Sequence, residues 1–150
     1  MSSTSHITID EEALANNIRF IRSLVGCELK ISAVVKGNAY GHGISAVIPA
    51  LQDQDIDHFS VYSSAEAKET HRFLLPESTL MIMGFIYPAD LPWIIENEIE
   101  FYVGDLFILD HALETARSLG KKARIHLEVE TGMYRTGLTL SQLKRAVERI

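Results

Sequence analysis

Lys36 ends an apolar stretch at residues 31–35 and enters the loop GNAYGHG (residues 37–43), which has three glycines in seven residues. A lysine whose amine is partly desolvated loses its proton more readily and can then attack a carbonyl to form a Schiff base. Closely spaced glycines allow a tight turn whose backbone N–H groups are free to face a ligand. The same pattern also fits a solvated lysine beside a glycine turn, so both interpretations stay open.

A second group of reactive side chains lies in the segment EVETGMYRTG (residues 128–137), which also follows an apolar stretch. Arg135 stands between two glycines and near the acidic residues Glu128 and Glu130. A carboxylate can fix a guanidinium so that its planar fork faces an anion. The alternative is an ordinary surface ion pair within a loop, and this segment alone does not separate the two.

Five short segments rich in β-branched or aromatic residues are the expected strands that carry these groups. They lie at residues 31–35, 59–62, 80–83, 99–103 and 125–129. Helical patterns separate them, so strand and helix alternate along the chain. This alternation predicts βαβ units and a parallel sheet.

The expected helices begin and end at recognisable signals. The first follows Asp10 and stops at Gly26, and others are predicted over residues 44–51, from near Asp90, and from near Asp105 to Gly120. Capping boxes, in which two side chains satisfy the first free N–H groups of a helix, are predicted at Ser63-x-x-Glu66 and Thr139-x-x-Gln142.

The alternation of side chains along the strands favours a barrel over an open, doubly wound sheet. Ile125, Leu127 and Val129 alternate with His126 and Glu128. An open parallel sheet covered on both faces would be apolar on both. A barrel instead packs apolar side chains under its helices and builds its site from inward residues at the carboxyl ends of the strands. We therefore expect an α/β chain that forms part of a (β/α)8 barrel.

The composition is that of a folded globular chain. It has 150 residues, a net charge of −6 and 47% hydrophobic residues, which excludes intrinsic disorder. No basic run is present, which argues against nucleic-acid binding. Cys27 is the only cysteine, so no disulfide can form within the chain, and we expect a buried thiol in a cytoplasmic protein. Neither a secretory signal, a membrane span nor a metal-ligand set is predicted.

The two glycine-containing segments together closely resemble the two signatures of the alanine racemase family. The first is VKGNAYGHG at residues 35–43, and the second is TGMYRTG at residues 131–137, at the expected distance along the chain. Residues 10–25 also look like the first helix of that family. Amino-acid decarboxylases of the same fold share the short Lys-x-Asn element but are not expected to carry the Tyr-Gly-His-Gly that follows it.

The resemblance implies a fold type III enzyme that binds pyridoxal 5′-phosphate (PLP) in an N-terminal (β/α)8 barrel. Lys36 matches the lysine that binds the cofactor covalently and then serves as one of two acid–base groups at the substrate Cα. Tyr40 matches the tyrosine that contacts the cofactor phosphate. Arg135 matches the arginine near the pyridoxal phenolic oxygen and the substrate carboxylate. The opposite base in the family is a tyrosine from the partner of a homodimer, and no residue here matches it.

The sequence departs from the family pattern at two positions. Glu128 stands where a lysine is common, and that lysine can be carbamylated to orient the motif arginine. Because Glu128 brings a carboxylate there directly, we expect it to hold Arg135 by charge-assisted hydrogen bonds, with the two head groups within about 4 Å. Tyr134 stands where a glycine is common. Its larger side chain either alters the substrate pocket or only covers the loop, so the range of substrates stays open.

The expected function is the interconversion of L- and D-alanine, an isomerase activity that supplies D-alanine for cell-wall peptidoglycan. The alternatives are a non-catalytic PLP-binding barrel and an inactive fragment of a racemase with a broader substrate range. A (β/α)8 barrel has eight strands in about 250 residues, and five are predicted here. Residues 1–150 are therefore expected to be the N-terminal part of the barrel domain, without the remaining strands and a C-terminal β domain, and inactive alone.

Overall fold

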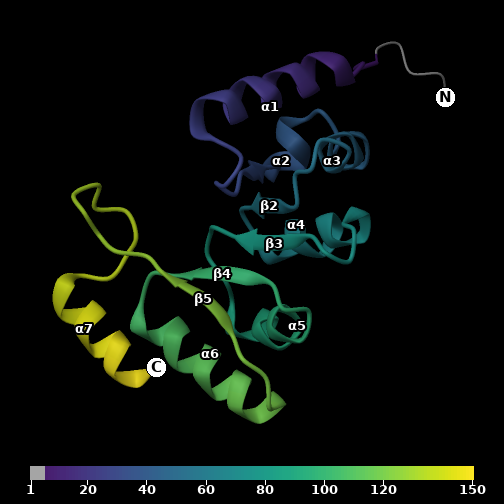
Figure 1. The fold of residues 1–150 in the computed structure, drawn as a ribbon. Helices are drawn as coiled ribbons and strands as arrows, with labels where there is room; N and C mark the ends of the chain where they lie inside the picture. Colours follow the sequence, from purple (N-terminus) through teal and green to yellow (C-terminus); the bar gives the residue numbers. More distant parts are fainter. Residues whose placement is uncertain (1–5) are drawn as a thin grey trace.

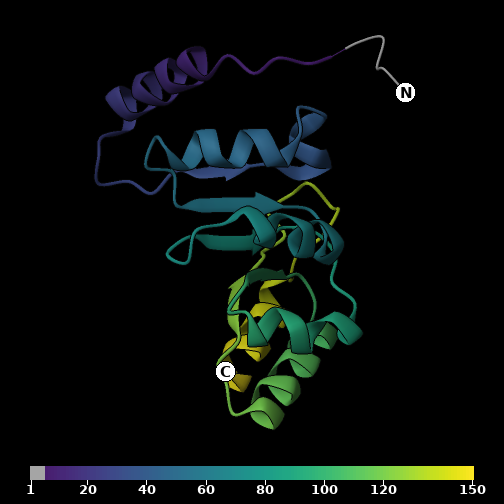
Figure 2. The same ribbon diagram turned by 90° about the vertical axis from the view of Figure 1, so that its right-hand side faces the viewer.

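The computed structural model describes residues 6–150 as a curved parallel sheet with helices around it (Figure 1; Figure 2). The strands are β1 (Ser32–Val34), β2 (His58–Val61), β3 (Thr79–Ile82), β4 (Glu100–Val103) and β5 (Arg124–Leu127). They pair side by side in sequence order, and every pair is parallel. Each strand overlaps a segment predicted from the sequence, so the five expected βα units are confirmed.

The helices expected from the sequence begin close to their predicted capping residues, and a further short helical segment follows directly after β1. They are α1 (Glu11–Val25), α2 (Lys36–Tyr40), α3 (Ile44–Gln52), α4 (Ser64–Thr70), α5 (Leu91–Glu96), α6 (Leu106–Leu119) and α7 (Leu140–Arg149), with short 3-10 turns at His71–Phe73 and Pro88–Asp90. Asp10 accepts a hydrogen bond from the Ala13 N–H at 2.9 Å at the start of α1. Both predicted capping boxes, before α4 and before α7, are present.

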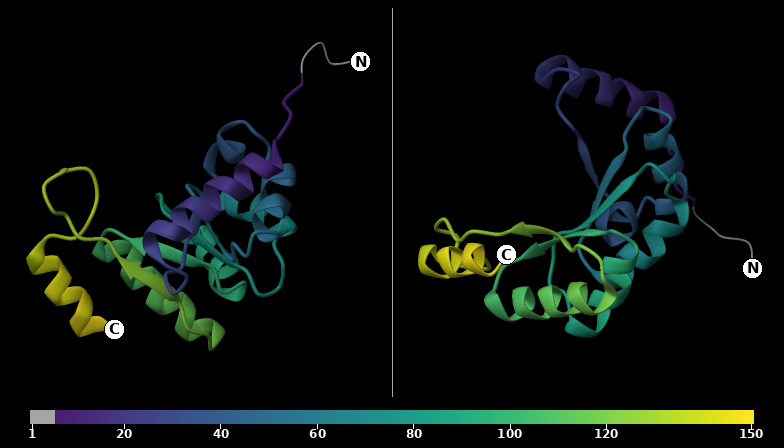
Figure 3. Two further views of the ribbon diagram at one scale, coloured as in Figure 1. Left: turned by 45° about the horizontal axis from the view of Figure 1, so that its top comes forward. Right: turned by 60° about the horizontal axis from the view of Figure 1, so that its bottom comes forward.

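The core lies between the outer face of the sheet and the helices. Alternate strand residues on this face are almost completely buried: Phe59, Val61, Leu80, Ile82, Phe101 and Val103. The register places Phe59 beside Leu80 and Ile82 beside Phe101, so these side chains form continuous apolar rows. In the right-hand view of Figure 3 the helices follow one another in an arc around the strands. This arrangement confirms the expected one-sided packing.

The inner face of the sheet carries a chain of polar side chains. The Ser32 hydroxyl lies 2.6 Å from that of Ser60 and 2.8 Å from Nδ1 of His58. Glu100 accepts hydrogen bonds from Nε2 of His126 at 2.8 Å and of His58 at 3.5 Å. Burial alone would raise the pKa of Glu100, but the hydrogen bonds from the two histidines outweigh it and hold that pKa below its ordinary value.

One expectation about the chain outside the core was wrong. Cys27 is exposed, because it lies in the connection between α1 and β1 and not on a packed face. None of the helices among residues 6–150 combines the length and the apolar character needed to cross a membrane.

Candidate active site

Two loops that carry the candidate reactive residues follow the outer strands of the sheet. Lys36 follows β1 and Arg135 follows β5. Because all strands are parallel, their carboxyl ends meet at the same end of the sheet, which is where barrel enzymes build their sites. We call residues 36–43 the lysine loop and residues 130–137 the arginine loop.

The lysine loop has an unusual backbone. Gly37, Asn38, Ala39 and Tyr40 have φ angles of 62°, 54°, 53° and 55°, so the chain makes a left-handed turn directly after Lys36. Three of these four residues carry a side chain, and a left-handed conformation costs such a residue about 1–2 kcal/mol. A strained backbone of this kind persists only where its surroundings fix it, and it is typical of functional sites.

Several contacts fix this turn. The Val35 N–H donates to the Ser60 carbonyl at 2.8 Å, which anchors the chain just before Lys36. The side-chain oxygen of Asn38 accepts a hydrogen bond from the Ile44 N–H at 2.9 Å and so ties the loop to the start of α3. Ala39 is buried against the core.

Glu66, near the start of α4, binds the lysine loop from a neighbouring unit. Its Oε2 accepts hydrogen bonds from the N–H groups of Tyr62 at 2.8 Å and Ser63 at 3.3 Å, and the hydrogen bond from Ser63 belongs to the capping box. Its Oε1 accepts a hydrogen bond from the Gly37 N–H at 2.8 Å. The sequence predicted the capping box and missed this second contact. The sequence feature that could have indicated this contact is a capping glutamate that follows a strand next to the strand of Lys36.

The arginine loop is closed at its base. The Leu138 N–H donates to the Glu128 carbonyl at 2.8 Å, and the Glu130 N–H donates to the Leu138 carbonyl at 3.0 Å. The side chain of Glu130 accepts a hydrogen bond from the Gly132 N–H. Hydrogen bonds from the backbone of Gly132 and Tyr134 hold the pKa of the Glu130 carboxyl below its ordinary value.

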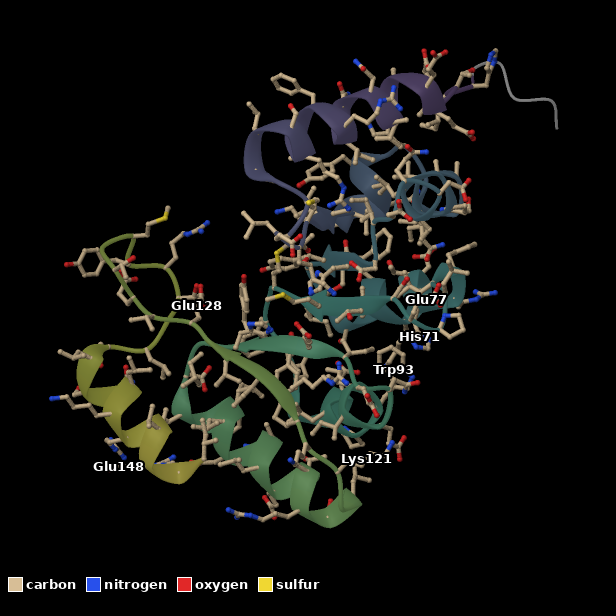
Figure 4. The ribbon with its side chains drawn as sticks, viewed as in Figure 1. His71, Glu77, Trp93, Lys121, Glu128 and Glu148 are labelled. Atoms are coloured by element: carbon tan, nitrogen blue, oxygen red, sulfur yellow. The ribbon has the colours of Figure 1, made fainter. Side chains whose placement is uncertain are left out.

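The expected pair between Glu128 and Arg135 was wrong. Among residues 6–150 no carboxylate lies within 4.0 Å of the Arg135 guanidinium. Glu128, labelled in Figure 4 at the end of β5, instead accepts a hydrogen bond from the Thr136 hydroxyl at 2.8 Å. The loop turns Arg135 outward, where water solvates its charge, so an ion pair would bring little stabilisation.

A side chain at Gly104 would crowd the base of the arginine loop. A Cβ at Gly104, just after β4, would lie 3.0 Å from Oε2 of Glu128 and 3.3 Å from the Gly137 nitrogen. Glycine at this position therefore allows Glu128 and the loop to approach β4.

The structure places Lys36, Tyr40 and Arg135 at one end of the sheet, without a direct hydrogen bond or ion pair between them in the described chain. Tyr40 is 64% exposed, and the Lys36 amine has no side-chain partner among residues 6–150. An unpaired amine, a phenol and an unpaired guanidinium suit an anionic ligand that also bears a carbonyl. No group of acidic, histidine and cysteine side chains in this part of the chain is suited to hold a metal ion.

Comparison with known proteins decides the family. The profile described as "Alanine racemase, N-terminal domain" matches residues 9–150. The chain belongs to the alanine racemase N-terminal domain family. An alanine racemase of Clostridium perfringens strain SM101 is 39% identical over 129 residues, which is 86% of this chain. Alanine racemase 2 of Caldanaerobacter subterraneus subsp. tengcongensis is 32% identical over 135 residues, or 90% of this chain.

Solved alanine racemases share the fold. The enzyme from E. faecalis superposes with a TM-score of 0.84 at 28% identity, over 94% of this chain and 38% of that one. The one from Clostridium difficile 630 gives 0.83 at 28% identity, over 91% of this chain and 36% of that one. The chain spans about a third of the length of the curated relatives named above. The curved sheet is therefore the N-terminal part of a TIM-type barrel, and the alanine racemase resemblance of the two signatures is confirmed.

Proposed function

We propose that this chain provides the cofactor lysine of a PLP-dependent alanine racemase. The observation that carries the proposal is Lys36: an amine without a side-chain partner in the described chain, at the carboxyl end of a barrel strand, in a loop whose left-handed backbone is fixed on both sides. Membership of the alanine racemase N-terminal domain family supports the assignment.

The residues of the two loops have different roles in this reaction. PLP, when bound, supplies an electron sink that eases removal of the proton from the substrate Cα. Lys36 would hold the cofactor covalently through its amine, and the same amine would take up or return a proton at the substrate Cα from one face. The Tyr40 hydroxyl would hold the cofactor phosphate. The Arg135 guanidinium, which no carboxylate of residues 6–150 neutralises, would bind the substrate carboxylate.

Racemisation needs a second base on the opposite face of Cα. We infer that a partner subunit of a homodimer supplies it. Residues 1–150 then form the N-terminal part of a PLP-binding barrel domain, and the chain alone is inactive. In this proposal the enzyme works in the cytoplasm, and its product, D-alanine, is used for synthesis of cell-wall peptidoglycan.

The test combines an absorbance spectrum with a racemisation assay, both on the full-length protein. Adding PLP should produce an absorbance band above about 400 nm, and the protein should convert L-alanine to D-alanine. Lys36→Ala should abolish both, whereas Lys30→Ala, which removes an exposed lysine paired with Asp57, should leave both intact. A band without racemisation would identify a PLP carrier, and absence of the band would exclude the proposal.

A further inference from the structure

We propose that Glu66 is a positioning residue for Lys36, an inference that rests on the proposed function. Its carboxylate joins two neighbouring βα units at the end of the sheet where Lys36 stands. One oxygen binds the N–H of Gly37, directly after the lysine, and the other binds the N–H groups of Tyr62 and Ser63, directly after β2. Helix capping uses the contact to the Ser63 N–H and does not need the contact to Gly37.

The contact to Gly37 determines where Lys36 points. The N–H of Val35, on one side of the lysine, is bound to the Ser60 carbonyl at 2.8 Å. The N–H of Gly37, on the other side, is bound to Glu66 at 2.8 Å. With the backbone fixed before and after Lys36, the direction of its Cα–Cβ bond is fixed relative to β2.

The same contact stabilises the change of handedness after Lys36. The left-handed turn of residues 37–40 contains three residues with side chains, and each pays a conformational penalty of about 1–2 kcal/mol. Within residues 6–150, Glu66 provides the only hydrogen bond that reaches residues 36–43 from outside residues 35–47. A bond between a carboxylate and a backbone N–H is stronger than one between neutral groups, so it suits this task.

Glu66 acts through the backbone and not through its charge on the lysine amine. No carboxylate of the described chain lies within 4.0 Å of the Lys36 amine. Glu66 is therefore not a catalytic residue, and its loss should change how well the loop is prepared for the cofactor, not the chemistry that Lys36 performs.

Two substitutions separate the capping task from the positioning task. In Glu66→Gln the amide oxygen can still accept the hydrogen bonds of Tyr62 and Ser63, but the amide NH2 then faces the Gly37 N–H, and two donors cannot bind each other. Ser63→Ala does the reverse: it removes the hydroxyl that accepts the Glu66 N–H at 3.3 Å and leaves the Glu66 carboxylate in place. Glu69→Gln, on an exposed side chain of the same helix, is the matched control.

The measurements are the Kd for PLP, from the absorbance band of the full-length protein, and the thermal midpoint of the apoprotein. Glu66→Gln should raise the Kd about tenfold, because a smaller fraction of the loops is in the binding-competent arrangement, with a midpoint near that of the native protein. Ser63→Ala should lower the midpoint and leave the Kd unchanged. Glu69→Gln should change neither.

The outcomes distinguish this inference from the function on which it rests. If the native protein forms no band with PLP, the proposed function fails. If the native band forms and Glu66→Gln binds PLP with the native Kd, the positioning role is overturned. The unmodified protein provides a separate test, because the Gly37 amide should be protected from hydrogen exchange. An unprotected Gly37 amide would also overturn the role of Glu66.

Discussion

The lysine loop and the arginine loop stand at the same end of the sheet, yet different contacts hold them. The lysine loop is bound by neighbouring elements: Val35 is tied to β2, Gly37 to Glu66 near the start of α4, and Asn38 to the start of α3. The arginine loop is bound mainly by its own residues and by the strand end that leads into it. Figure 1 shows this second loop standing clear of the helices between β5 and α7.

The exposure of the two loops follows from these contacts. Ala39, in the lysine loop, is 4% exposed, whereas Met133 and Tyr134, at the tip of the arginine loop, are 71% and 88% exposed. The position of Lys36 is thus determined within the first two βα units. Arg135 lies in a loop whose tip is held, within residues 6–150, only by its own residues and by Glu128. The surrounding fold therefore holds the lysine side of the site more firmly than the arginine side.

The largest effect is expected at the base of the arginine loop. Gly137 has a φ of 110°, and a Cβ there would lie 2.7 Å from the Glu130 nitrogen and 2.9 Å from the Val129 carbonyl carbon. Gly137→Ala adds this overlap to backbone strain and should cost the closed loop about 3 kcal/mol. Hydrogen exchange of the Leu138 and Glu130 amides in the full-length protein should accelerate by about 100-fold.

The control for this prediction is Gly132→Ala. Gly132 also has a positive φ, 124°, but a Cβ there meets nothing within 4 Å. Gly132→Ala should therefore accelerate hydrogen exchange of the Leu138 amide clearly less than Gly137→Ala does. Equal acceleration in the two variants would show that the base of the loop is as open as its tip.

A smaller effect is expected in the lysine loop at Asn38. Asn38→Ala loses the hydrogen bond to the Ile44 N–H and places an alanine at a φ of 54°, so the free energy of unfolding should fall by about 2 kcal/mol. Asn38→Gly loses the same hydrogen bond but tolerates the left-handed backbone, so the fall should be about half as large. Denaturant unfolding of the full-length protein measures both. Equal losses would show that the left-handed turn is not strained.

Contacts within one short segment were predictable from the sequence, whereas contacts between segments were not. The capping boxes before α4 and α7 follow from residues three positions apart, and the strands follow from their own side-chain alternation. The left-handed turn depends on Glu66 and on burial of Ala39, which only the assembled units provide. The Glu128–Arg135 pair was predicted from proximity in sequence, but the path of the loop gives Glu128 the Thr136 hydroxyl instead.

The smallest effect is expected from acid at the tip of the arginine loop. Hydrogen bonds from the backbone N–H groups of Gly132 and Tyr134 favour the ionised form of Glu130 and hold its pKa below the ordinary value of 4.5. Because the pKa in the folded loop is lower than in the open one, ionised Glu130 stabilises the folded loop above pH 4.5, and this contribution is lost as the pH falls through the lowered pKa. The group is solvent-exposed, so the change is local.

Amide chemical shifts of Gly132 and Tyr134 measured against pH follow this change directly. In the native protein they should titrate with a midpoint below 4.5, and in Glu130→Gln that titration should vanish. A midpoint at or above 4.5 would mean that the tip does not bind the Glu130 carboxylate. The arginine loop would then be held at its base alone, and the contrast with the lysine loop would be greater than the structure shows.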